Sequence, residues 1–154
     1  MKTNFDGALF VESNQARIRV VVRNNRGQVM AALAKNIPKP TSSKILEVMV
    51  ARRAIQFVLE LGFVHSIFEG DAEMVVKALA DGNCSIPSIG HIVKNIESIS
   101  GLLRTKSFSH VRRQGNTVAH ALAQRARLSF PILIWMKDVP SNIYCFVFAD
   151  FPIS

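Results

Sequence analysis

The chain has 154 residues, of which 49% are hydrophobic and 19% are charged, and this balance excludes a disordered chain and fits one compact domain. Nineteen Lys and Arg residues against 11 Asp and Glu residues give a formal net charge of +8 and a pI near 10.1. Such a basic protein favours nucleic acid as its partner, ahead of an anionic membrane surface, while a charge that only maintains solubility is the alternative.

The first part of the chain is predicted to form three antiparallel strands. Residues 17–23 (RIRVVVR) and 28–34 (QVMAALA) have strand-like composition, and residues 24–27 (NNRG) form a turn between them, since Asn and Gly tolerate a positive φ. Residues 2–11 (KTNFDGALFV) add a further strand. We expect this strand to break or bend near Asp6, because an Asp-Gly step is typical of turns.

An amphipathic helix is predicted over residues 43–61. Ser42 and its hydroxyl neighbours follow two prolines and supply an N-terminal cap, and Gly62 ends the helix. Its apolar side chains recur at helical spacing and form one face: Val50, Ala51, Ala54, Val58 and Leu61.

The rest of the chain alternates between strand and helix patterns. The predicted elements are a strand at 64–71, helices at 72–80 and 89–103, a strand at 106–113 and a last helix from 116 to about 129. This order predicts an α/β domain with a mixed sheet. We assign residues 1–130 to one domain and expect residues 131–154, an apolar tail, to pack on it.

Neither a membrane segment nor an extracellular signature is predicted. The most apolar stretch, residues 131–149, is interrupted by charged residues and a proline, so it does not read as a membrane span. No apolar signal-peptide core follows Met1. Cys84 and Cys145 are too few and too far apart for a disulfide framework or a zinc site. We therefore expect a monomeric protein of the nucleus or cytoplasm, with no membrane partner.

Three acidic residues stand in unusual surroundings. Asp6 lies in an apolar strand, where the alternative is a turn aspartate before Gly7. Glu47 falls on the apolar face of the helix at 43–61, where a carboxylate is costly unless it is paired, protonated or bound to metal. A structural role for this glutamate near the helix start is the alternative. Asp71 follows a strand, where ligands gather in α/β sheets, and the alternative is a simple helix cap.

Together these residues predict a carboxylate cluster inside a basic domain. Three carboxylates in one place repel one another unless cations offset their charge. Oxygen-only ligands point to Mg²⁺ or Mn²⁺ rather than to zinc. A pair of such ions can activate water and stabilise the leaving oxygen of a phosphodiester.

Five segments in order resemble the plant ribonuclease H-like domains related to retroelement reverse transcriptases: NFDGALF, RVVVRNNRGQVMAAL, EVMVARRAIQFVLELGF, FEGDAEMVVKAL and FSHVRRQGNTVAHALA. The resemblance covers residues 2–130. It implies a five-stranded mixed sheet, three antiparallel strands and then two parallel ones, with helices on both faces. It also implies two-metal hydrolysis of the RNA strand of RNA–DNA hybrids, with Mg²⁺ or Mn²⁺ bound by Asp6, Glu47 and Asp71.

The chain departs from this family at the fourth catalytic position. Active relatives carry Asp there, whereas this chain has His120 within NTVAHALA. A neutral imidazole is a poor match for Mg²⁺, and a plain helix residue near the site is the alternative. The His-bearing loop of the bacterial and animal enzymes is also missing. The resemblance therefore implies either an endonuclease with impaired activity or a non-catalytic module that binds hybrid or double-stranded nucleic acid.

Contacts to nucleic acid are expected from Arg17, Arg19, Arg112, Arg113 and Asn116. The first two stand where relatives usually have small residues, so they either crowd the sheet or contact phosphate. For at least half of the arginines a solvated surface is the alternative. Few aromatic residues lie near them, and binding should therefore be directed to the backbone and be sensitive to salt. A third hypothesis, suggested by the apolar tail, is a protein-interaction domain left over from a retroelement.

Overall fold

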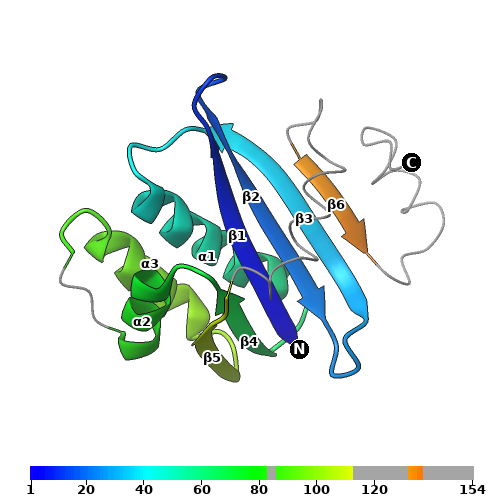
Figure 1. Cartoon of the computed structure of the whole chain (residues 1–154). Coiled ribbons are helices and arrows are strands. Elements are labelled where there is room, and N and C mark those ends of the chain that lie inside the picture. Colours follow the sequence, from blue (N-terminus) through cyan, green and yellow to red (C-terminus); the bar gives the residue numbers. More distant parts are fainter. Residues whose placement is uncertain (83–85, 113–131, 137–154) are drawn as a thin grey trace.

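The computed structural model describes residues 1–82, 86–112 and 132–136. Its strands are β1 (Lys2–Phe10), β2 (Gln15–Arg23), β3 (Val29–Pro38), β4 (His65–Gly70), β5 (Thr105–His110) and β6 (Ile132–Met136). Its helices are α1 (Ser43–Glu60), α2 (Glu73–Asp81) and α3 (Gly90–Ser100). The strands form one mixed sheet in the order β5-β4-β1-β2-β3-β6 (Figure 1). The predicted five-stranded core is confirmed, and β6 pairs antiparallel with β3 at one edge.

The strands β1, β2 and β3 form the predicted antiparallel meander. Between β2 and β3, the N–H of Gly27 donates to the carbonyl of Asn24 at 3.0 Å, and Gly27 has a φ of +76°. A side chain at this φ would be strained, which is why the turn needs glycine there. The sequence signal at residues 24–27 therefore located this turn correctly.

The strand β1 does not break at Asp6, so that expectation was wrong. It pairs with β2 without interruption from Lys2 to Phe10. The reason for Gly7 is different: a Cβ there would lie 2.8 Å from Cγ of Leu46 and 3.0 Å from Cγ2 of Val50. Glycine thus lets α1 lie closely against β1, rather than letting the chain turn.

The two parallel strands separate where the acidic residues lie. Pairing of β1 with β4 covers only Lys2 to Asn4, opposite Ile67 to Glu69, while β1 stays paired with β2 as far as Phe10. We call the region beyond Asn4 and Glu69 the β1–β4 fork. Because the backbones no longer hydrogen-bond there, side chains can enter between the two strands.

Helix α1 matches the helix predicted over residues 43–61. The hydroxyl of Ser42 accepts a hydrogen bond from the N–H of Ile45 at 3.2 Å and caps the first turn. The chain leaves the helix through Gly62, at a φ of +82°. Its apolar side chains, among them Val50 and Ala54, are fully buried against the sheet.

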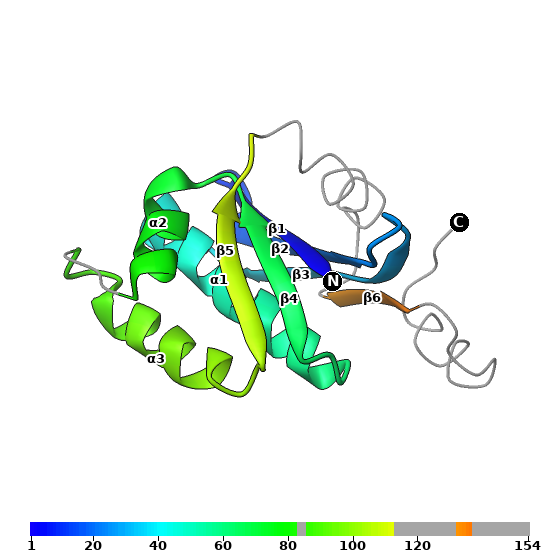
Figure 2. The same cartoon turned by 90° about the horizontal axis from the view of Figure 1, so that it is seen from below.

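Helices α1, α2 and α3 pack on one another on the same face of the sheet (Figure 2). The helix expected at 116–129 lies outside the described residues. Of the helices that the structure describes, none has the length and hydropathy needed to cross a membrane.

Replacing Gly7 with alanine is expected to lower the free energy of unfolding by about 1–3 kcal/mol, because the added methyl overpacks the contact with Leu46 and Val50. Urea denaturation measures the change. Gly90→Ala is the matched control, since nothing lies within 4 Å of a Cβ at that position and it starts a helix. The control should be neutral or stabilising by up to about 1 kcal/mol. Equal effects of the two substitutions would contradict the close-packing role of Gly7.

Candidate metal centre

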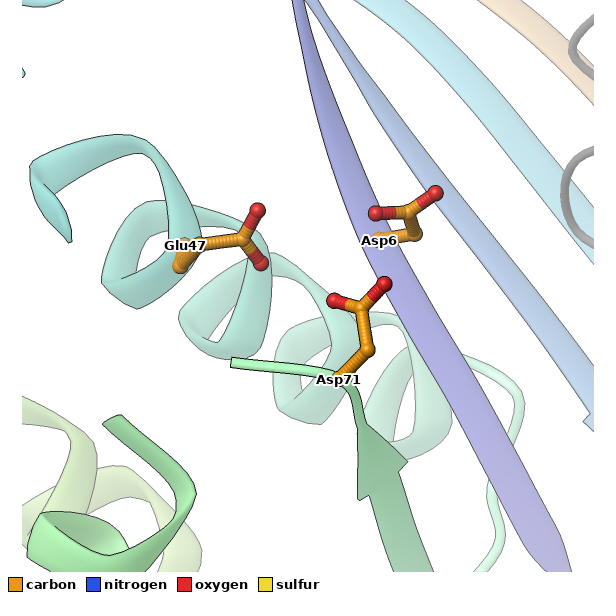
Figure 3. Close-up of side chains that lie close together, drawn as sticks. All are labelled: Asp6, Glu47 and Asp71. Atoms are coloured by element: carbon orange, nitrogen blue, oxygen red, sulfur yellow. The ribbon is translucent and has the colours of Figure 1, made fainter. Parts of the chain in front are cut away.

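Three carboxylates from three separate elements meet at the β1–β4 fork. Asp6 lies in β1, Glu47 near the start of α1, and Asp71 directly after β4. One ligand oxygen from each lies within 4.8 Å of the others, and the three side chains point toward one another (Figure 3). The sheet topology therefore brings together Asp6 and Asp71, which are 65 positions apart in the sequence.

Asp6 reaches the cluster from the face of the sheet that α1 does not cover. Side chains alternate along a strand, and Phe5 and position 7 face α1, so Asp6 faces the other side together with its β2 partner Arg19. Its Oδ2 forms an ion pair with Arg19, and its Oδ1 accepts a hydrogen bond from the N–H of Gly7 at 2.8 Å. The turn alternative for this aspartate is therefore wrong.

Glu47 approaches from the opposite face. It is half-buried and belongs to a stretch of α1 whose neighbours Leu46, Val48 and Val50 are buried. The absence of a side chain at Gly7 lets this part of α1 lie against β1. Because the strands have separated at the fork, the glutamate can extend toward Asp6 instead of being stopped by paired backbone.

Asp71 enters the cluster from the end of β4. Helix α2 begins at Glu73 with Ala72 as its N-cap, so Asp71 stands one position before the cap. The preceding Gly70 is packed against Phe5, since a Cβ there would lie 2.6 Å from Cζ of the ring. Two glycines, one beside each aspartate, thus allow the close packing on which the fork is built.

The three carboxylates fit a divalent cation. Hard cations such as Mg²⁺ and Ca²⁺ take oxygen ligands at about 2.0–2.6 Å, so oxygens that share one ion lie within about 4–5 Å of one another. The 4.8 Å spread of the cluster lies at the upper end of that range, slightly wider than one Mg²⁺ spans, and all three donors are carboxylate oxygens. Both oxygens of Asp6 keep further lone pairs beyond the Arg19 and Gly7 contacts, because a carboxylate offers about four acceptor sites.

The residues expected to contact nucleic acid differ in burial. Arg17 and Arg19 are buried, at 5% and 7% exposure, whereas Arg112 is exposed. Arg113, Asn116 and His120 lie outside the described residues. The sequence patterns did not predict the pairing of Arg19 with Asp6. Its signal was the register of the β1–β2 hairpin, which sets these two residues directly opposite each other.

Two neutral groups, the Asn36 amide and the Phe10 ring, contact Arg17. Its Nε donates to Oδ1 of Asn36 at 2.7 Å, and its guanidinium lies 5.3 Å from the centroid of the Phe10 ring. Burial, and secondarily the charge of Arg19, lowers the pKa of Arg17. We expected Arg17 and Arg19 either to crowd the sheet or to contact phosphate, and neither explanation predicted these contacts. Their contact with phosphate stays a prediction.

Comparisons with known proteins place this geometry in context. A family model described as reverse transcriptase-like matches residues 4–126. A search of curated protein sequences finds no match. The structure is similar to RNase H1 from the halophilic archaeon Halobacterium salinarum, with a TM-score of 0.70 and 23% identity over 79% of this chain and 92% of that one.

Two further solved structures share the fold. LC11-RNase H1, isolated from compost and solved in complex with an RNA/DNA hybrid, has a TM-score of 0.68 and 20% identity, covering 79% of this chain and 91% of its own. The prototype foamy virus protease-reverse transcriptase has a TM-score of 0.61 and 16% identity, with coverage of 84% and 21% respectively. The TM-scores show a common fold, and at identities of 23% and below the similarity shows the fold alone.

Proposed function

The chain belongs to the reverse transcriptase-like family, and from this premise we propose that it binds nucleic acid and hydrolyses the RNA strand of RNA–DNA hybrids. The observation that carries the proposal is the convergence of Asp6, Glu47 and Asp71 on one point. The net charge of +8 supports a polyanionic substrate. The hybrid bound by LC11-RNase H1, which shares this fold, supports the same substrate class.

Asp6, Glu47 and Asp71 would hold the divalent ions, Mg²⁺ or Mn²⁺. When bound, such ions supply an activated water and stabilise the leaving oxygen of the phosphodiester. The protein's own contribution is placement: Gly7 and Gly70 let the three elements meet, and Arg19 orients Asp6. A fourth ligand role for His120 belongs to the same proposal, and it implies slower cleavage because imidazole adds no negative charge.

A hybrid-cleavage assay tests this function. We expect the full chain to release RNA fragments from a labelled RNA–DNA hybrid in Mg²⁺ or Mn²⁺ and to leave the hybrid intact in chelator. Asp71→Asn is the matched control, because it keeps the shape of the side chain and removes the charge that holds the cation. Equal background from both proteins would end the enzymatic proposal.

The second candidate is a binding module without catalysis, favoured by His120 in place of the fourth acid. The same preparations distinguish it. Binding to the hybrid that weakens steeply between low and moderate salt, with no fragments released, is the result that this candidate requires. An absence of binding at low salt would exclude both candidates.

A further inference from the structure

A permanent positive charge lies beside the carboxylate cluster. Arg19 stands directly opposite Asp6 in the β1–β2 register, and its terminal nitrogen contacts Oδ2 of that aspartate. Both residues are buried at 7% exposure, so the ion pair is shielded from solvent. The guanidinium of Arg19 therefore brings a formal positive charge next to the cluster.

This charge changes what a cation meets at the cluster. Three carboxylates and one guanidinium carry a formal charge of −2 rather than −3. Arg19 also uses an oxygen of Asp6, the residue that any ion held by the cluster must share. A positive group at this place both repels a divalent ion and competes with it for one ligand.

The residues beside this ion pair favour the contact of Arg19 with Asp6. Arg17, two positions along β2 on the same face, is likewise buried and repels it. On the other side of the pair, the N–H of Gly7 fixes the orientation of the Asp6 carboxylate. The aspartate is thus held in place before any ion arrives.

We propose that Arg19 is the built-in counter-ion of this cluster: it positions Asp6 when no metal is bound, and it weakens the binding of divalent ions. The inference rests on the proposed function, since it concerns ions at the same three carboxylates. It assigns Arg19 a positioning role, distinct from the phosphate contact suggested by its charge alone.

The binding of Mn²⁺ to the full chain, followed by the EPR signal of the free ion, tests this role. We expect Arg19→Gln, which keeps a hydrogen-bond donor without the charge, to lower the Kd for Mn²⁺ by about tenfold or more. Arg19→Ser tests the same point if the glutamine variant does not fold. Arg19→Lys retains the charge and should bind Mn²⁺ within about threefold of the wild type.

Arg23→Gln is the matched control. Arg23 lies on the same strand and the same face, but its partners are Glu69, at 3.9 Å, and the amide oxygen of Asn4. We expect its Kd for Mn²⁺ to stay within about twofold of the wild type, because Arg23 does not contact the cluster. An effect as large as that of Arg19→Gln would indicate a general change in surface charge and would overturn the assignment.

Thermal unfolding supplies a second readout. In chelator, Arg19→Gln should unfold at a lower temperature than the wild type, and added Mn²⁺ should raise its Tm more than that of the wild type. If the wild type binds Mn²⁺ and Arg19→Gln binds it equally or more weakly, the inference is overturned and the proposed function stands. If neither protein binds Mn²⁺, both fail.

Discussion

Replacing Asp6 with alanine should lower the free energy of unfolding by roughly 3–5 kcal/mol in the absence of metal, because the substitution leaves the buried guanidinium of Arg19 without its carboxylate. The side chains of both residues are about nine-tenths buried, so bulk solvent compensates little for the lost partner. Urea denaturation in chelator, monitored by far-UV circular dichroism, measures the difference.

Another arginine–carboxylate pair in the same chain provides the control. Arg53 donates two hydrogen bonds to Glu60, at 3.0 and 3.2 Å, but the glutamate side chain is 57% exposed. Glu60→Ala should cost about 1 kcal/mol or less, since exposed pairs are screened by solvent. If the two alanine variants lose the same stability, burial is not what gives the Asp6 pair its importance.

Asp71→Asn should have opposite effects on stability and on activity. Without metal, three carboxylates within 4.8 Å repel one another, and removing one charge should raise the free energy of unfolding by about 1 kcal/mol. For a chain of this length that corresponds to a rise in Tm of about 2–4 °C. With metal, cleavage of the hybrid should fall at least about 100-fold, because the charge that holds the cation has been removed.

Two thermal unfolding scans and one rate measurement for each protein check the effects on stability and on activity. The Tm of each protein is determined in chelator and then in excess Mn²⁺, which should stabilise the wild type and leave the variant nearly unchanged. Initial rates of hybrid cleavage are taken under the second condition. A variant that is less stable than the wild type in chelator would mean that Asp71 serves packing rather than the binding of cations.

The positions of two of the three carboxylates could be inferred from local patterns. Glu47 sits on the apolar face of a helix with clear boundaries, and Asp71 follows a short apolar strand, so both could be placed from helical periodicity and strand ends. The order of strands and helices along the chain followed from the same patterns together with the turn at residues 24–27, whereas the five-stranded sheet was implied by the family resemblance. These features depend on neighbours close in the sequence.

The remaining features of the site depend on pairing between distant segments. The contact of Asp6 with Arg19 requires the exact register of β1 and β2, and a shift of one residue would turn Arg19 to the other face. The role of Gly7 depends on where Leu46 of α1 crosses β1, and neither hydrophobicity nor turn propensity carries that information. An Asp-Gly step is common in turns, and this prior favoured the wrong interpretation.

The parallel pairing of β1 with β4 also bears on the order in which the protein folds. The hydroxyls of Thr3 and Ser66, which meet at 2.7 Å beside this pairing, are 63 residues apart in the chain, whereas Asp6 and Arg19 are separated by 13. Short loops close at a lower entropic cost than long ones, so the β1–β2 hairpin is expected to form earlier than the contact with β4. Asp6 would then already be paired with Arg19 when Asp71 arrives, and this ion pair would reduce the repulsion that the incoming carboxylate meets.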